Sequence, residues 1–357
     1  MARTRPANTV VFLTDNHARS ALGCFGDMAI STPAIDSISR HGVRFTNAYC
    51  ASPLCCPARA ALATGSYPHQ TGFFDNVLVY DGSVPSWMHR ARDAGRKVVS
   101  VGKLHFRSDE DDNGFSEEII PMHILNKRGG TAMLLRAAGG ELQATGQWEL
   151  YTEQSGVGTT VYQQYDRDIT QRVIAWLRQE AQNETGEPWI LFVSFASPHP
   201  PFKVPQNLDE MYDLEDMPLP AAFDPSQRSE HPAAVHLRKI MGTGAIEDPD
   251  LLRRVAKGYY GLITHIDRQI GEILGEIEAL DLGDTRMIYT SDHGEMLGAQ
   301  GIFGKSCVYE GAIRVPLIIS GADMPENQVI DTPVSHIDLF QTILESAGVA
   351  AHPDDAG

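Results

Sequence analysis

The sequence has few basic residues for its length. Its 357 residues include 29 Lys and Arg against 46 Asp and Glu, and the formal net charge is −17. A protein that binds nucleic acid needs a basic face that displaces counterions from the phosphates. We therefore expect no nucleic-acid partner. A small cationic pocket stays open, because net charge reports on solubility and steering rather than on single sites.

The sequence also lacks a long hydrophobic run. Its first apolar run, residues 10–13, is too short for the core of a signal peptide. No stretch approaches the ~20 apolar residues of a membrane helix. The cysteines are odd in number and show no disulfide-framework spacing (Cys24, Cys50, Cys55, Cys56 and Cys307). These features predict a cytoplasmic protein with reduced thiols and no membrane partner.

Short apolar runs alternate with amphipathic segments along the chain. Strands are predicted at residues 9–14, 97–101, 189–195, 286–291 and 315–320, and helices at 33–41, 166–182, 255–277 and 337–347. This alternation predicts an α/β fold, a mostly parallel central sheet with helices on both faces. We expect residues 1–357 to form one such domain. Within it, residues 108–160 have weak periodicity and are predicted to be an irregular insertion near the functional site.

Polar residues directly follow four of the predicted strands. They are Asp15-Asn16, Lys103 with His105, His199, and Asp292-His293. In such sheets, ligands bind outside the carboxyl ends of the strands. The two Asp-containing pairs supply three oxygen donors and one imidazole, which suit one divalent cation. An Asp after a strand is by itself more often a turn or helix cap, so the prediction rests on both pairs together.

Residues 54–65 (LCCPARAALATG) place two cysteines before a proline and an alanine-rich helical run. The beginning of such a helix favours an anion. A thiol-phosphatase site would need Cys-x5-Arg, whereas eight, three and two residues separate Arg59 from Cys50, Cys55 and Cys56. A zinc site is not indicated either, since no Cys-x2-Cys or Cys-x2-His pair exists.

The segment Cys55-Cys56-Pro57-Ala58-Arg59, followed by Thr64-Gly65, resembles the Cys-x-Pro-x-Arg…Thr-Gly signature of the type I sulfatases, which belong to the alkaline phosphatase superfamily. Ala58 stands where the family more commonly has Ser. Five further motifs resemble the family in the correct order: Asp15-Asn16, Gly102-Lys103-Leu104-His105, Pro198-His199-Pro200-Pro201-Phe202, Asp292-His293-Gly294, and Lys305 with Tyr309-Glu310 and Arg314-Val315-Pro316. Six motifs in order make the resemblance specific and extend it over nearly the whole chain.

The resemblance implies a nucleophile and a metal. In this family the first cysteine of the signature is oxidised to formylglycine, and its hydrated aldehyde attacks sulfur. The match assigns this role to Cys55 and not to Cys56. The formylglycine oxygen would join Asp15, Asn16, Asp292 and His293 around one divalent cation, with Ca²⁺ favoured and Mn²⁺ or Mg²⁺ as alternatives.

The resemblance also implies the remaining roles. Lys103 and Lys305 would stabilise the sulfuryl oxygens, and Arg59 would hold the hydrate. His199 would protonate the leaving oxygen. His105 would take a proton from the second hydroxyl of the hydrate, which expels sulfate and regenerates the aldehyde.

Two relatives compete for the assignment of activity. The choline-sulfatase-like branch is the most similar, and it implies hydrolysis of sulfate monoesters. The phosphonate monoester hydrolases and phosphodiesterases share Cys-x-Pro-Ala-Arg and an Asn near Asn76, but typically have neutral residues where this chain has Lys103 and His105. A third hypothesis is a metal- or sulfate-binding protein in which Cys55 stays a thiol.

The implied partners are a small-molecule sulfate ester and a formylglycine-generating enzyme, and a homo-oligomer stays open. Family members usually continue into a small antiparallel C-terminal subdomain. The chain reaches Gly357 shortly after its last predicted helix, so we expect that subdomain to be missing or truncated.

Overall fold

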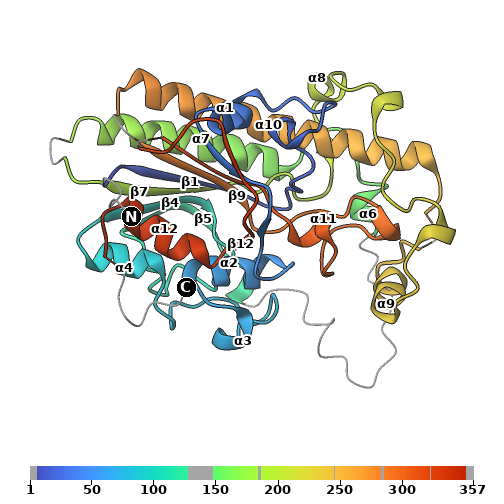
Figure 1. The fold of residues 1–357 in the computed structure, drawn as a ribbon, viewed down its shortest axis with the longest axis horizontal. Helices are drawn as coiled ribbons and strands as arrows, with labels where there is room; N and C mark the ends of the chain where they lie inside the picture. The colour runs from blue at the N-terminus through green and yellow to red at the C-terminus, as the bar shows by residue number, and fades with distance from the viewer. Residues whose placement is uncertain are drawn as a thin grey trace.

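The centre of the protein is an eight-stranded sheet (Figure 1). The computed structural model describes residues 6–127, 148–183, 186–244, 246–282, 285–321 and 323–350. In spatial order the strands are β11 (Gln328–Ile330), β2 (Gly42–Phe45), β10 (Leu317–Ser320), β9 (Arg286–Ser291), β1 (Thr9–Thr14), β7 (Trp189–Ser194), β4 (Lys97–Lys103) and β5 (Glu117–Met122). Only β10 runs antiparallel to its neighbours in this sheet. The predicted mostly parallel sheet is therefore confirmed.

Helices cover both faces of the sheet, as predicted. In Figure 1, α1 (Pro33–Arg40), α7 (Val161–Glu180) and α10 (Pro249–Ala279) lie above it, and α2 (Cys55–Thr64), α4 (Trp87–Asp93) and α12 (Asp338–Ser346) lie below it. Alternate residues of β1 divide between the two cores: Val10 and Phe12 pack under α7 and α10, whereas Val11 and Leu13 pack toward the α2 side. This explains why β1 reads as an unbroken apolar run.

Shorter elements join the main ones. The helices are α3 (Pro68–Thr71), α6 (Trp148–Tyr151), α8 (Gln206–Asp209), α9 (Pro232–Met241) and α11 (Glu310–Ile313), and the 3-10 turns are η1 (Gly23–Phe25), η2 (Leu125–Lys127), η3 (Leu214–Asp216), η4 (Pro225–Gln227) and η5 (Ala299–Gly301). Two small parallel sheets pair β3 (Ala48–Tyr49) with β12 (Val334–Ser335) and β6 (Gly156–Val157) with β8 (Lys203–Val204). Parts of α6, α8 and α9 share a third apolar core with α10.

The segment predicted to be irregular, 108–160, is partly regular. It contains β5, which pairs in parallel with β4 at the edge of the main sheet. The apolar pattern did not show this strand, because an edge strand with two glutamates at its start and a proline near its end carries no clear alternation. Residues 128–147 of this segment, and the chain end after residue 350, lie outside the described residues. The single-domain organisation stays a prediction.

Two further observations concern the cysteines and the membrane. The cysteines are all free in the structure. Among the helices of the described residues, none is both long and apolar enough to cross a membrane.

Candidate active site

Four neighbouring parallel strands deliver the predicted residues to one edge of the sheet. β9, β1, β7 and β4 lie side by side, and the motif residues follow their carboxyl ends. Helix α2 begins at this edge with Cys55. The helix is buried along its whole length, because four alanines among its ten residues allow close packing. Pro57 lies in its first turn, where no helical N–H is lost, and Gly65 ends it with φ 63°.

Four buried side chains converge at this edge. They are Asp15, Cys55, Asp292 and His293, and one ligand atom from each lies within 4.8 Å of the others. The Cys55 Sγ lies 3.2 Å from His293 Nε2 and 3.9 Å from Asp15 Oδ1. Two oxygen ligands of one Ca²⁺ ion lie at most about 5 Å apart, since each bond is about 2.3–2.6 Å. Two carboxylates, an imidazole and the group at position 55 therefore fit one divalent cation.

Asn16 lies beside this cluster in a fixed orientation. Its amide nitrogen donates a hydrogen bond to Glu295, and its Oδ1 accepts one from Lys305 Nζ at 3.1 Å. Glu295 is buried and also accepts hydrogen bonds from the backbone N–H groups of Leu297 and Gly304. Burial raises the pKa of Glu295, while these donors oppose the rise. By accepting from the amide nitrogen, Glu295 turns the amide oxygen of Asn16 toward Lys305. The sequence did not predict this role for the residue that follows the Asp-His-Gly motif.

Tyr259 holds the turn that carries Asn16. Its hydroxyl donates to the Asn16 carbonyl and accepts from the Ala18 N–H, both at 2.8 Å. The turn needs this support because Asn16 has φ 74°, in the left-handed region. The helical pattern of α10 predicts a buried Tyr259, but apolar periodicity cannot show which group its hydroxyl binds.

Arg59, one turn into α2, ties the two carboxylates together. Its Nε donates to Asp292 Oδ2 at 2.8 Å, and its Nη2 donates to Asp15 Oδ2 at 3.2 Å. Its Nη1 donates to the Lys103 carbonyl and the Ser194 hydroxyl. Although burial lowers the pKa of Arg59, Asp292 and Asp15 outweigh this and raise it. Arg59 therefore orients the carboxylates, in addition to the contact with the hydrate that the resemblance implies.

Two buried lysines flank the cluster. Lys103 Nζ lies 2.7 Å from Asp15 Oδ2. Burial lowers the pKa of Lys103, but the attraction of Asp15 and other acidic neighbours outweighs burial and raises it. Lys103 therefore stays charged. For Lys305, burial is outweighed in the same way by Cys55 and other acidic neighbours, and its pKa is raised. Gly102 has φ 105° at an irregularity between β4 and β5, and a Cβ there would lie 2.2 Å from the Ser194 carbonyl. Glycine is therefore required immediately before Lys103.

The two adjacent cysteines differ in their surroundings. Burial and Asp15 raise the pKa of Cys55, but Lys305 and His293 overcome them, so its pKa is lowered. Cys56 instead packs in an apolar cluster with Val79 and Ile124, and burial raises its pKa. The structure thus brings Cys55, and not Cys56, to the proposed metal ligands.

Two histidines complete the site. His105 has φ 57° and its Nδ1 is buried without a hydrogen-bond partner among the described residues. The Nδ1 of His199 lies 2.9 Å from the Pro200 carbonyl, which leaves Nε2 free to face a ligand. Burial, reinforced chiefly by Lys103 for His105 and by Lys305 for His199, lowers the pKa of both well below 6.5. Both rings are therefore neutral at pH 7 when no anion is bound.

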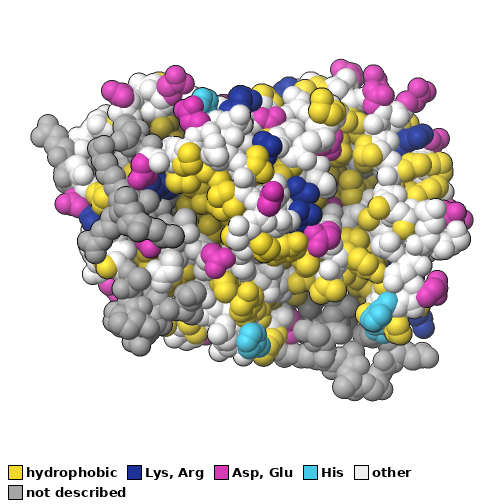
Figure 2. All heavy atoms as spheres, in the orientation of Figure 1, with side chains coloured by type: hydrophobic (Ala, Val, Ile, Leu, Met, Phe, Trp, Pro, Cys, Tyr) yellow, Lys and Arg dark blue, Asp and Glu magenta, His cyan; other side chains and the backbone are white. Residues whose placement is uncertain are grey.

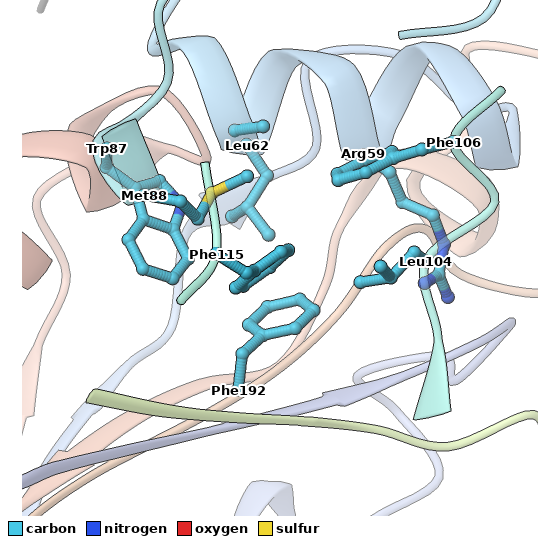
Figure 3. Close-up of a pocket in the computed structure, with 9 residues that line it drawn as sticks. Arg59, Leu62, Trp87, Met88, Leu104, Phe106, Phe115 and Phe192 are labelled. Carbon is cyan, nitrogen blue, oxygen red and sulfur yellow. The ribbon is translucent and has the colours of Figure 1, made fainter. Parts of the chain in front are cut away.

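A small cavity lies between α2 and the sheet, beside the aliphatic part of Arg59 (Figure 3). Its volume is about 10 Å³, and aromatic and aliphatic side chains line it. Arg59 contributes only its aliphatic stem, because its guanidinium binds the carboxylates. A cavity of this size is at the lower limit for one water molecule, and its apolar walls offer no polar partners. We assign it to core packing.

Comparison with known proteins decides the family. Residues 7–349 match the sequence model of the Sulfatase family. The chain belongs to the sulfatase family. It is 29% identical to a choline-sulfatase of Rhizobium meliloti over 335 residues, which cover 90% of this chain and 64% of that protein. It is 30% identical to arylsulfatase K of Xenopus laevis over 333 residues, which cover 90% of this chain and 59% of the relative. The resemblance inferred from the motifs is therefore confirmed.

The fold is shared with a solved structure of another hydrolase. The phosphonate monoester hydrolase of Agrobacterium radiobacter superposes with a TM-score of 0.76 at 23% identity, over 99% of this sulfatase chain and 76% of the hydrolase. The chain spans about two thirds of the length of its first curated relatives, 64% of one and 68% of another.

Proposed function

We propose that this sulfatase-family protein hydrolyses sulfate monoesters, through a formylglycine formed from Cys55 and one divalent cation. The observation that carries the proposal is the convergence of Cys55 with Asp15, Asp292 and His293, whose ligand atoms lie within 4.8 Å of one another. Asn16 is the further ligand that the family resemblance implies. Hydrolysis would consume one water and release sulfate and an alcohol.

Charge placement supports this reaction. A divalent cation held by these residues would act as a Lewis acid toward the sulfuryl oxygens. Lys103 and Lys305 add two buried positive charges beside the same residues. In a sulfate ester, negative charge grows on the leaving oxygen as the S–O bond breaks, and fixed charges in a buried site stabilise it more than water would.

Proton transfer falls to the two histidines. His105, with its lowered pKa, is neutral and suits the role of base toward the second hydroxyl of the hydrate. His199 has to be protonated to act as an acid. A bound sulfate ester adds negative charge near the ring, and this raises the pKa of His199. We propose that substrate binding itself prepares His199 to protonate the leaving oxygen.

Mass spectrometry tests the nucleophile. Trypsin cleaves after Arg44 and Arg59, so one peptide carries Cys50, Cys55 and Cys56. Conversion to formylglycine removes one sulfur and two hydrogens and adds one oxygen, and fragmentation assigns the change to one residue. We expect the change at Cys55 in protein made together with a formylglycine-generating enzyme. An intact thiol at Cys55 in active protein would contradict the mechanism, and an intact thiol in inactive protein would favour the metal-binding alternative.

A substrate panel separates sulfate from phosphorus esters. The mature protein is assayed with choline, aryl and sugar sulfates and with a phosphonate monoester and a phosphodiester. We expect a sulfate ester to be the best substrate. Lys103→Ala should reduce sulfate ester hydrolysis more than phosphodiester hydrolysis, because a sulfate ester presents three non-bridging oxygens to the cation and a phosphodiester presents two. Equal losses would remove the reason to prefer sulfate over the phosphonate and phosphodiester alternative.

A further inference from the structure

The loop that carries His199 has few backbone donors of its own. It joins β7 to β8, and Pro198, Pro200 and Pro201 have no N–H group. His199 N–H bonds back to the Ala196 carbonyl at 3.2 Å, within the loop itself. Its angle toward the metal cluster therefore depends on contacts from other elements.

Asp166, in the second turn of α7, anchors the start of this loop. One carboxylate oxygen accepts from the Ala196 N–H at 2.7 Å, and the other accepts from the Ser197 N–H at 3.2 Å. Asp166 has no solvent exposure. Burying a carboxylate is unfavourable unless hydrogen bonds compensate it, and an apolar residue would serve packing at least as well. The geometry that these two bonds impose is therefore the reason for a carboxylate here.

Tyr162 lies one helical turn before Asp166, on the same face of α7. Its ring stands perpendicular to the His199 imidazole, with the ring centroids 5.8 Å apart. The Lys103 Nζ lies 5.9 Å from the centre of the same ring. Tyr162 therefore touches two of the groups to which we assign chemistry, from outside the motifs that define the family resemblance.

The far end of the loop is held by the same helix. Gln163 donates a hydrogen bond from its side-chain amide to the Lys203 carbonyl, and its Oε1 accepts from the Thr160 N–H at the start of α7. Farther along α7, Ile169 and Val173 pack into the core against the sheet. The later part of α7 thus packs against the sheet, and its first two turns form hydrogen bonds with both ends of the loop.

We propose that Asp166 and Tyr162 are positioning residues, which hold the His199 imidazole at the angle from which it protonates the leaving oxygen. This inference rests on the proposed function, since it takes His199 as the acid. It adds two residues of α7 to the reaction. Neither needs to touch the substrate.

The test compares Asp166→Asn with the wild type on a series of aryl sulfates whose phenols differ in acidity. A poor leaving group needs protonation and a good one does not. We expect kcat for the poorest leaving group to fall at least about tenfold more than kcat for the best, with KM little changed. Asp168→Asn is the matched control. Asp168 is exposed on the same helix, and among the described residues its side chain accepts a hydrogen bond only from Gln164.

Equal losses on all aryl sulfates would overturn the proposal, because a folding defect or a smaller active fraction scales every substrate alike. Tyr162→Leu provides a second route should Asp166→Asn fold poorly. It should steepen the dependence on the leaving group in the same way, and Tyr162→Phe, which keeps the ring, should restore the wild-type dependence. An unchanged dependence in Tyr162→Leu would count against the proposal.

Hydrogen–deuterium exchange gives a readout that needs no activity. In Asp166→Asn, the Ala196 and Ser197 amides should exchange faster than in the wild type, while peptides of β1 and β9 are unchanged. Unchanged exchange in the loop would overturn the anchoring role. A wild-type protein that hydrolyses no sulfate ester would refute the proposed function instead, and the exchange result would still decide whether Asp166 anchors the loop.

Discussion

Arg59 joins the chemistry of the site to its geometry. A planar guanidinium can bind two carboxylates at fixed angles, whereas an ammonium acts as a point charge. In the structure, two different nitrogens of Arg59 bind Asp15 and Asp292. Residues that orient metal ligands in this way contribute to metal affinity without touching the ion.

Arg59→Lys should therefore weaken metal binding. We expect a loss of about 10- to 100-fold in Ca²⁺ affinity by calorimetry, with the protein still folded. Arg178→Lys is the control, because Arg178 forms an ion pair with Glu276 and is largely exposed. An affinity within twofold of wild type in Arg59→Lys would show that the carboxylates keep their orientation without the guanidinium.

The adjacent cysteines give a second prediction. Cys55→Ala should abolish aryl sulfate hydrolysis, while its circular dichroism stays native. Cys56→Ala should reduce activity by less than about tenfold, because it removes only a sulfur from the apolar cluster with Val79 and Ile124. If Cys56→Ala is inactive although its Cys55 is converted to formylglycine, the assignment of the nucleophile to Cys55 is wrong.

At the scale of elements, α10 supports the fold through a buried carboxylate. Asp267 accepts hydrogen bonds from the Ala34 and Ile35 N–H groups at the start of α1. Burial raises the pKa of Asp267 from 3.8 to about 6. A raised pKa means that the folded state binds the proton more tightly, so the stabilisation is complete below pH 3.8 and is lost as the pH rises through about 6.

The stability of the wild type relative to Asp267→Asn should therefore increase as the pH falls from 7 to 4. A shift of about two pKa units corresponds to roughly 3 kcal/mol in total, most of which should develop over this range. Urea denaturation at several pH values measures it. Asp168→Asn is the control, because it makes the same change at an exposed position on α7. A difference that is independent of pH would mean that the pKa of Asp267 is not raised.

The strand ends were predictable, but their supports were not. Asp15, Lys103, His199 and Asp292 could be placed at one edge because apolar runs mark parallel strands and polar residues end them. The supports lie far away in sequence, and their side chains look ordinary there. Asp166 reads as one more polar residue of an amphipathic helix, and the tyrosines of α10 read as core. Only the fold shows which hydroxyl or carboxylate meets which backbone group.

Boundaries were predictable only in part. α7 begins at Val161 rather than at 166, since the glutamine three residues after Thr160 accepts a hydrogen bond from the Thr160 N–H and extends the helix by about a turn. α10 begins at Pro249, because the Asp248 side chain caps it. The added turn at the start of each helix is more polar than the rest of the helix. The apolar pattern alone therefore predicts a start that is too late in the sequence.

At the scale of the whole molecule, the surface and the site carry opposite charge. Figure 2 shows acidic side chains scattered over one face of the protein, among larger apolar and neutral areas. The net charge is −17, yet Arg59, Lys103 and Lys305 are buried together at the sheet edge. The groups proposed to bind an anion thus lie in the interior of a protein whose net charge is negative.

Metal binding should stabilise the whole fold, since the cluster draws residues from the ends of two strands, β1 and β9, and from the start of one helix, α2. Ca²⁺ at about 100 times its Kd should add about 2.7 kcal/mol and raise Tm by a few degrees, and a chelator should reverse this. Differential scanning calorimetry measures the shift. Asp292→Ala should melt at the same temperature with and without Ca²⁺, and a persistent shift in that variant would place the ion elsewhere.

Arg59 and the two lysines bring three positive charges to a cluster with two carboxylates, Asp15 and Asp292. A divalent ion and a substrate anion that bind side by side in this cluster attract each other. Each ligand should therefore improve the affinity of the other, and the improvement should be the same factor in both directions. The substrate would then act as part of the metal's own binding site, and the release of sulfate would loosen the ion that helped to bind the ester.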